Sequence, residues 1–354
     1  MARKIGVLTF HRCINYGSYW QARCLVDGLR ARGHDAELLD HRSVAVERAE
    51  MRCAFQPQLP RRTARSDHPA LGLKTRKFVA AIQRLPLSEP FDLDAPERIG
   101  GYDAIVVGSD EVWNFQHPWY GSNPIFFGRG IQSERLVSYA ASFGNHDAEH
   151  GIATDWAGSL SGFSALSVRD DNSRRLIAGA LAVDPALVLD PCLQFPDGIP
   201  AARTSAPLRT AIVYGHGFPA WFEAAVRRWA DRRGVWLVSI GNRNDWADEQ
   251  RIDAAPADFA DAFAGAQAVA TNFFHGCVFA LRHATPFVCA ATPYRLNKLR
   301  DLTASLGAAR HLVDAATPDG EYDALLGEAL DAAVGERMAA LRGQSDAFLD
   351  QALG

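Results

Sequence analysis

The sequence predicts an α/β protein with two open, parallel-sheet domains in tandem. The length of 354 residues exceeds one ordinary domain core but suits two. Short apolar runs alternate with helical patterns in both halves of the chain. A Pro-rich stretch at residues 196–208 separates the halves and is the predicted linker.

The first half opens with a strand, a turn and a helix. Residues 5–10 form a short apolar run before a polar loop, which is typical of a buried parallel strand. Asn15 starts a turn suited to a helix N-cap, and Gly33 suits the end of a helix over 19–32. The pattern weakens between 42 and 98, where one helix is predicted near 74–84. Further strands of the same sheet are predicted at 36–40, 102–108, 136–141, 165–169 and 186–191.

The second half repeats the alternation. Its strands are predicted at 210–214, 235–240, 268–271 and 286–290, and its helices at 220–233, 257–264, 276–282, 296–306 and 322–351. We therefore expect a Rossmann-like domain at 1–195 and a second at 209–354, with the last helix a candidate to pack back on the first domain. Open parallel sheets bind ligands outside the carboxyl ends of their strands, so the active site is expected in an interdomain cleft.

Composition and charge narrow the functional classes. Hydrophobic residues make up 48% and charged residues 22%, which is typical of a globular protein. The net charge of -4 disfavours nucleic-acid binding. The chain shows no secretory signal at its start and no apolar run of about 18 residues, so we expect a cytoplasmic protein with at most peripheral membrane contact.

No metal or organic cofactor is expected. The sequence has no C-x-x-C, H-x-x-x-H or D-x-D spacing, which leaves little support for a metal site. The loop after the first predicted strand lacks G-x-G-x-x-G, which disfavours a nicotinamide or flavin cofactor.

Polar clusters follow several of the predicted strands. They read T-F-H-R-C-I-N-Y-G at 9–17, G-S-D-E-V-W-N at 108–114, S-Y-A-A-S-F-G at 138–144, S-V-R-D at 167–170, L-D-P at 189–191, N-F-F-H-G at 272–276 and N-K-L at 297–299. Each cluster is weak evidence, but the ordered set resembles the motifs of the polysaccharide pyruvyl transferase family over about residues 5–313.

The resemblance implies a fold and a reaction. The fold would be similar to that of the two-domain GT-B glycosyltransferases. The reaction would move a pyruvyl group from phosphoenolpyruvate to two hydroxyls of a sugar, giving a cyclic ketal and free phosphate. Phosphoenolpyruvate would be a co-substrate rather than a cofactor, and the setting would be bacterial polysaccharide biosynthesis. The N-terminal domain would bind the acceptor and the C-terminal domain the donor.

Three residues are candidates for acid–base catalysis. His275 lies at a predicted strand end where a helix begins, so its imidazole, a common general acid or base, would lie beside main-chain N–H groups suited to an anion. Gly276 would let a ligand approach the backbone closely. Asp110 could remove a proton from a sugar hydroxyl or cap the next turn. His11 could be a second acid or base, or a surface-loop histidine.

The donor's anionic groups need a cationic partner. Many family members carry R-x-H-G, and Phe273 stands here in place of that arginine. The remaining candidates for donor binding are Arg169, Arg243, Arg295 and Lys298. The replacement leaves two alternatives open: a GT-B-like transferase with another donor, such as a nucleotide sugar, or a non-catalytic binding protein that has lost the donor arginine.

Four residues are candidates for acceptor binding. Asn15 and Tyr16 could hydrogen-bond the acceptor, and Trp20 replaces a smaller residue usual at that place in the family. Trp113 could stack on a sugar ring or close the core. The sequence does not name the acceptor beyond a sugar-containing molecule.

Overall fold

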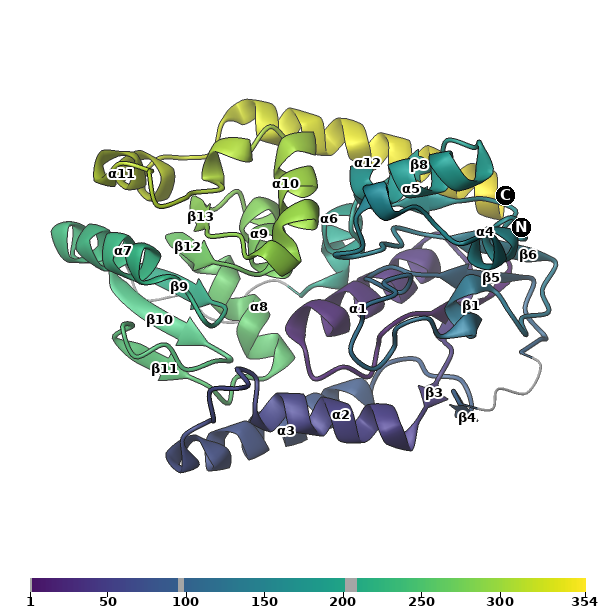
Figure 1. Ribbon diagram of the computed structural model, residues 1–354, viewed down its shortest axis with the longest axis horizontal. Coiled ribbons are helices and arrows are strands. Elements are labelled where there is room, and N and C mark those ends of the chain that lie inside the picture. The colour runs from purple at the N-terminus through teal and green to yellow at the C-terminus, as the bar shows by residue number, and fades with distance from the viewer. Residues whose placement is uncertain (1, 95–98, 201–208) are drawn as a thin grey trace. The chain divides into compact units, whose positions relative to one another are not determined.

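The chain forms two compact α/β units in a computed structural model that describes residues 2–94, 99–200 and 209–354 (Figure 1). The first unit comprises Met1–Glu50, Ile82–Gly198 and Met338–Gly354, and the second comprises Met51–Ala81 and Ile199–Arg337. This division differs from a boundary at residue 195, because residues 51–81 belong to the second unit. Most of the predicted linker, 201–208, lies outside the described residues.

The first unit contains a four-stranded parallel sheet. Its strand order is β2 (Asp35–Leu38), β1 (Lys4–Leu8), β5 (Ala104–Val107) and β6 (Arg135–Ser138). Helix α1 (Tyr16–Ala31) follows β1, and Asn15 caps it by accepting hydrogen bonds from the N–H groups of Gly17 and Ser18. The apolar side chains of β1 and β5 are buried, as the short apolar runs predict.

Two predicted strands do not extend this sheet as expected. β7 (Ser167–Val168) and β8 (Ala186–Leu187) form a separate parallel pair, which only isolated bridges connect to the β6 edge. Two features interrupt the ladder. Ala140 has a φ of 52°, which turns the chain out of the extended conformation. Side-chain hydroxyls also form hydrogen bonds here in place of main-chain groups. The Ser138 hydroxyl donates to the Ser167 carbonyl at 3.0 Å, and the Ser167 hydroxyl donates to the Ser138 carbonyl at 2.8 Å.

The weakly patterned region holds more structure than the sequence predicts. Helix α2 (Val44–Phe55) was not expected, and α3 (His68–Ile82) begins six residues before the predicted helix. The remaining elements of the first half are β3 (His41–Arg42), β4 (Phe91–Asp92), α4 (Thr154–Leu160), α5 (Asp171–Leu181) and α6 (Pro191–Gln194). Single-turn helices occupy Arg65–Asp67, Pro124–Phe127, Ala148–His150, Pro196–Gly198, Pro293–Arg295 and Ala309–His311.

The second unit contains a five-stranded parallel sheet. Its order is β11 (Glu249–Arg251), β10 (Trp236–Ile240), β9 (Thr210–Tyr214), β12 (Ala268–Thr271) and β13 (Phe287–Cys289). The helices are α7 (Ala220–Arg233), α8 (Pro256–Ala264), α9 (Phe274–Arg282), α10 (Leu296–Ser305), α11 (Asp319–Gly327) and α12 (Ala332–Leu353). The single helix predicted at 322–351 is therefore two helices, and the polar edge strand β11 was not predicted.

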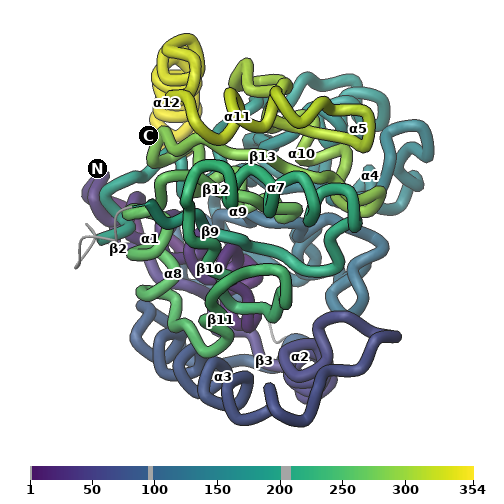
Figure 2. The backbone as a smooth tube through the Cα atoms, turned by 90° about the vertical axis from the view of Figure 1, so that its left-hand side faces the viewer, coloured from purple at the N-terminus to yellow at the C-terminus, as the bar shows by residue number. Residues whose placement is uncertain are grey.

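Two helices, α3 and α12, contact parts of their own unit that lie far from them in sequence. In the second unit, α3 lies beside the β10–β11 side of the sheet (Figure 2), where Lys77 donates to the carbonyl and carboxylate of Asp253, both at 2.8 Å. In the first unit, Arg342 of α12 donates to the Leu193 carbonyl at 2.7 Å. No helix within the described ranges has the length and apolar character that crossing a membrane requires.

Candidate functional site

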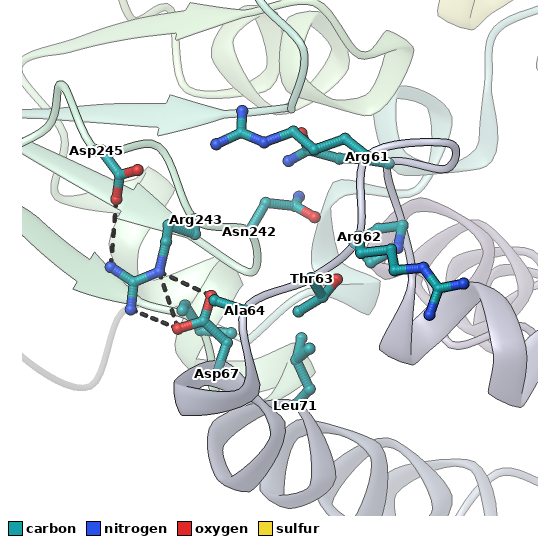
Figure 3. A pocket seen from close by; sticks show the side chains of 12 residues that line it. Arg61, Arg62, Thr63, Ala64, Asp67, Leu71, Asn242, Arg243 and Asp245 are labelled. Atoms are coloured by element: carbon teal, nitrogen blue, oxygen red, sulfur yellow. Dashed lines mark hydrogen bonds and ion pairs between the residues drawn. The ribbon is translucent and has the colours of Figure 1, made fainter.

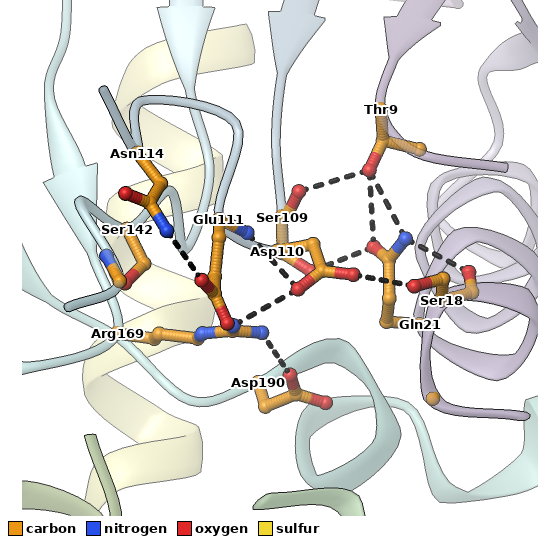
Figure 4. Close-up of polar contacts among 12 residues, drawn as sticks. Thr9, Ser18, Gln21, Ser109, Asp110, Glu111, Asn114, Ser142, Arg169 and Asp190 are labelled. Atoms are coloured by element: carbon orange, nitrogen blue, oxygen red, sulfur yellow. Dashed lines mark hydrogen bonds and ion pairs between the residues drawn. The ribbon is translucent and has the colours of Figure 1, made fainter. Parts of the chain in front are cut away.

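A polar network occupies the carboxyl ends of β1 and β5 in the first unit (Figure 4). The Thr9 hydroxyl donates to the Ser109 carbonyl at 2.9 Å, and the Ser109 hydroxyl donates to the Gln21 side chain at 2.7 Å. The Gln21 amide donates back to the Thr9 hydroxyl at 3.0 Å. The strand order reverses between β1 and β5, so this edge is where a doubly wound sheet binds ligands.

Asp110 is held in place from two sides within this network. The Ser18 hydroxyl donates to one carboxylate oxygen at 2.8 Å, and the Arg169 guanidinium donates to the other at 3.1 Å. Asp110 has a φ of 74°, a left-handed conformation that few side chains adopt without support. The network thus orients a carboxylate at a strand end, which agrees with the position expected for Asp110.

Arg169 does not have the surroundings expected of a donor-binding residue. Its guanidinium is buried and also donates to the Asp190 carboxylate at 3.0 Å (Figure 4). Two carboxylates therefore offset its charge, which leaves less of its field for an added anion. We assign Arg169 to holding Asp110 and Asp190 rather than to binding the donor.

His11 is fully buried, contrary to a role at a loop surface. Its ring nitrogens lie 3.1 Å from the Thr9 carbonyl and 3.1 Å from the Asp40 carboxylate. Burial raises the pKa of Asp40, but hydrogen bonds from His11 and Arg12 more than offset this and hold the pKa well below its usual range. These contacts favour a structural role for His11 over an acid–base role.

The neighbouring His41 predicts acid sensitivity of the first unit. Its ring is buried and lies 2.8 Å from the Thr9 carbonyl, and burial lowers its pKa to about 3. The unfolded chain takes up this proton below about pH 6.5 while the folded protein does not, so stability is lost as pH falls from 6.5 towards 3. Between pH 7.5 and 5 we expect this histidine to lower the unfolding free energy by about 2 kcal/mol. Urea unfolding of wild type and His41→Gln measures it, and an equal pH slope in both would contradict the expectation.

The acceptor candidates lie mostly in the interior. Trp113 is fully buried among Phe127, Phe143 and Phe163, and its indole N–H donates to a main-chain carbonyl, so the core explains this residue and sugar stacking does not. Tyr16 and Trp20 are also buried. Asn15 is exposed, but its side-chain oxygen is used to cap α1.

A second cluster of polar side chains follows β9 and β12 in the second unit. The order of this sheet reverses between these two strands, so their carboxyl ends mark its ligand-binding edge. His216 follows β9, and its carbonyl accepts a hydrogen bond from the Asn272 amide at 2.8 Å. His275 is the second residue of α9 and is 8% exposed. The structure thus places His275 at a helix N-terminus on the expected edge.

Gly276 has a packing role rather than the open approach that the sequence suggests. A Cβ atom at this position would lie 2.0 Å from the Thr271 hydroxyl oxygen, which itself donates to the Tyr214 carbonyl at 2.6 Å. Absence of a side chain therefore lets α9 start directly against the end of β12.

This contact predicts opposite effects for two glycine-to-alanine substitutions. Gly276→Ala is expected to lower the unfolding free energy by about 2–3 kcal/mol, because the new methyl group overlaps Thr271. Gly343→Ala, in exposed α12, meets no heavy atom within 4 Å and is expected to raise it by about 0.5–1 kcal/mol. Urea melts compare the two, and a Gly276→Ala protein as stable as wild type would show that the helix start can shift freely.

The three remaining donor candidates differ in their surroundings. The Arg295 guanidinium lies 4.4 Å above the ring centre of Phe273, and Lys298, in the first turn of α10, lies 5.7 Å from the Tyr294 ring centre. Arg243 lines a pocket with Arg61 and Arg62, where it forms an ion pair with the buried carboxylate of Asp67 (Figure 3). The ion pair with Asp67 makes Arg243 a weak candidate for donor binding.

The sequence model of the polysaccharide pyruvyl transferase family matches residues 15–293, which include Gln21, Ser109 and Asp110 of the first polar network and His216 and His275 of the second cluster. The chain belongs to this family. It is therefore a transferase, as its motifs predict. A search of curated proteins found no match.

Solved structures align with nearly the whole chain at low sequence identity. S. aureus MnaA, in a co-structure with UDP, is 12% identical with a TM-score of 0.51, covering 98% of this chain and 94% of that one. The UDP-GlcNAc 2-epimerase from Neisseria meningitidis bound to UDP-GlcNAc is 9% identical (TM-score 0.49, covering 96% and 98%). The E. coli ADP-heptose lps heptosyltransferase II is 13% identical (TM-score 0.34, covering 97% and 99%). The GT-B-like α/β fold is confirmed.

His216 belongs to the second polar cluster, although the sequence motifs did not single it out. Its ring lies 5.2 Å from that of Phe273 at 90°, next to the N-terminus of α9. The signal was present in the sequence, because Y-G-H-G at 214–217 places a histidine directly after a buried strand. The same pattern after β1 belongs to the fully buried His11, so the pattern alone does not distinguish a fully buried histidine from a partly exposed one.

Proposed function

We propose that this protein transfers the pyruvyl group of phosphoenolpyruvate to hydroxyls of a sugar-containing acceptor, forming a ketal and releasing phosphate. Family membership supports the reaction class. The observation that supports the donor is the guanidinium of Arg295, which lies on Phe273 two residues before His275. It brings a positive charge next to the position where other family members carry an arginine.

The chemistry sets three requirements on the site. The methylene carbon of the donor must gain a proton, and its central carbon must form a bond to each of two acceptor oxygens. Each acceptor hydroxyl must lose its proton, and the bond from the central carbon to the phosphate oxygen must break. Charge must be offset on the phosphate and carboxylate throughout.

The residues of the second unit suit the donor half of this reaction. The N-terminus of α9 presents main-chain N–H groups and a positive dipole end, which favour a bound anion. His275, in the first turn of this helix, is our candidate for the acid that protonates the methylene carbon. Arg295 can donate two parallel hydrogen bonds to a phosphate or carboxylate. Lys298, one turn along the chain from Arg295, remains a candidate for the same task.

Asp110 is our candidate for the base that accepts the hydroxyl proton. The Arg169 guanidinium and the Ser18 hydroxyl both donate to its carboxylate and hold it in one orientation at the strand end. We place the reaction in bacterial polysaccharide biosynthesis and in the cytoplasm, where phosphoenolpyruvate is a central metabolite.

The donor is tested by comparing ligands on the purified protein. Phosphoenolpyruvate is expected to raise the melting temperature, because a ligand that binds only the folded state stabilises it. UDP-sugars and ADP-sugars at the same concentration are expected to have no effect. Phosphate release in the presence of glycan acceptors then tests turnover. Stabilisation by a nucleotide sugar alone would replace the proposed donor, and no response to any anionic donor would favour a non-catalytic binding protein.

A further inference from the structure

The second unit contains a pocket apart from the cluster that follows β9 and β12. Segment 57–71 forms one wall and residues 242–252, after β10, form the other, and both segments belong to the second unit. The pocket has a volume of about 140 Å³, below the roughly 300–1,000 Å³ of sites that enclose a whole drug-sized ligand. It therefore suits one small chemical group rather than a complete nucleotide sugar.

A mostly buried amide faces this pocket. Asn242 is 7% exposed and lines the pocket, and no residue within 2–94, 99–200 or 209–354 forms a hydrogen bond with its side chain. Its main-chain carbonyl, by contrast, accepts a hydrogen bond from the Ser239 hydroxyl at 2.7 Å. Figure 3 shows the amide pointing toward the space between Arg61 and Thr63. Buried polar groups normally have a partner, so an amide directed into a pocket indicates a polar occupant.

The charges that line the pocket are unevenly paired. Arg243 bonds to both lining carboxylates: Asp67 at 2.8 and 2.9 Å, and Asp245 at 3.4 Å (Figure 3). Arg61 and Arg62 form no hydrogen bond or ion pair with any residue in the part of the chain that the structure describes. The pocket therefore has two cationic groups for which its own walls supply no carboxylate.

Of these two arginines, Arg61 is placed to share a ligand with Asn242. Its side chain runs from segment 57–71 toward the β10 side in Figure 3, whereas Arg62 points away from Asn242. Burial raises the pKa of Glu223, on α7, and Arg61 opposes this shift electrostatically, but the two groups form no ion pair. A guanidinium and an amide N–H group together suit a phosphate or a carboxylate, because both donate hydrogen bonds and one is cationic.

Two contacts hold the walls of the pocket together. Lys74 of α3 donates to the carbonyl of Gly241, the residue directly after β10, at 2.8 Å. Arg243 joins the same loop to Asp67. The walls are therefore fixed to each other before a ligand arrives, which lowers the entropic cost of binding one.

The pocket lies at the same sheet edge as the donor cluster but at a different strand. Asn242 follows β10 and His275 follows β12, and β9 lies between these strands. Neighbouring strands are about 4.8 Å apart, so the two strand ends are about 10 Å apart. The phosphate and carboxylate of phosphoenolpyruvate are both attached to its central carbon, so one donor molecule is too short to occupy both places. An anion in the pocket therefore belongs to another molecule.

We propose that this pocket binds a phosphate or carboxylate group of the sugar-containing acceptor, through the Arg61 guanidinium and the Asn242 amide. The assignment to the acceptor rests on the function proposed above, in which the acceptor is the second substrate. The acceptor is then a sugar phosphate or an acidic sugar, whose hydroxyls reach the donor while its anionic group stays in the pocket.

Calorimetry on the full-length protein tests the site with glucose 1-phosphate, glucuronate and glucose as separate probes. Wild type is expected to bind at least one anionic probe and not glucose, and the probe that binds identifies the group as phosphate or carboxylate. Arg61→Met is expected to weaken this binding at least about 10-fold, because it removes a charge-assisted contact. Asn242→Asp, which places a carboxylate beside the anion, is expected to abolish it. Both variants are expected to bind phosphoenolpyruvate like wild type.

Arg65 supplies the matched control, because it is an exposed arginine of the same segment that does not line the pocket. Arg65→Met removes the same charge and is expected to bind the anionic probes like wild type. An equal loss of affinity in Arg65→Met and Arg61→Met would indicate a general charge effect and overturn the site. Thermal melts check the fold of each variant. If Asn242→Asp does not fold, Arg61→Met, at an exposed position, carries the test.

The outcomes separate this inference from the proposed function. The site is overturned, and the donor left intact, if wild type binds phosphoenolpyruvate but neither anionic sugar, or if Arg61→Met binds the anionic sugars like wild type. Arg61-dependent binding of an anionic sugar by a protein that does not bind phosphoenolpyruvate would support the pocket and reject the donor. Loss of phosphoenolpyruvate binding in Arg61→Met would place the donor in the pocket and overturn its assignment to the acceptor. Wild-type protein that binds none of the probes would reject both.

Discussion

His275→Ala is expected to lower the rate of phosphate release from phosphoenolpyruvate by about 10²–10⁴-fold, the range for loss of a general acid. The expectation follows from the place of His275 in the first turn of α9, at the strand-order reversal of the second sheet. The fold should persist, because the substitution shortens a side chain without adding an atom. Steady-state phosphate release with a competent acceptor measures the rate, and circular dichroism checks the fold.

A histidine at the other end of the same helix is the control. His283 follows α9 as its C-terminal cap residue, and burial lowers its pKa to about 4. His283→Ala removes the same group from the same helix, so it reports any general effect on α9. It is expected to keep wild-type turnover. Full activity of His275→Ala would remove His275 from the mechanism, whatever its effect on stability.

Arg169→Met is expected to lower the unfolding free energy of the first unit by about 3–5 kcal/mol, the range for breaking a buried ion pair. The substitution keeps most of the side-chain volume but leaves Asp110 and Asp190 buried without their shared guanidinium. Both carboxylates were desolvated in exchange for that contact. Chemical unfolding at pH 7 measures the loss.

A surface pair provides the matched control for this substitution. Arg174 lies on the exposed side of α5 and forms a bidentate pair with the exposed Asp184. Water and salt screen such a pair, so Arg174→Met should leave the unfolding midpoint unchanged within error. Equal midpoints for Arg169→Met and Arg174→Met would show that the Asp110–Arg169–Asp190 group contributes no net stability, and would reopen a ligand-binding role for Arg169.

Much of the architecture could be read from local patterns in the sequence. The strands β9 and β12 and the helix α7 match their predicted bounds, because each depends on short-range periodicity and on the residues at its ends. The N-cap of α1 by Asn15 was predicted for the same reason. The order of the polar clusters identified the family and placed His275 and Asp110 at strand ends, since parallel strands present their carboxyl ends at one edge.

Only the folded chain distinguishes residues that look alike in sequence. Arg169, Arg243 and Arg295 all follow strands or lie in loops, but carboxylates from distant segments neutralise the first two, and the third stacks on Phe273. Trp113 was compatible with a sugar site or a core, and three surrounding aromatic rings decide for the core.

The sequence therefore specified the fold class, the family and the strand ends that carry polar residues, because local geometry and apolar periodicity encode them. Tertiary packing decided where each of those polar residues lies and which groups surround it, because burial and partner charges arise between segments far apart in the chain. The clearest case is Lys74, whose helix lies between strands of the first sheet in sequence but brings an ammonium group to the edge of the second.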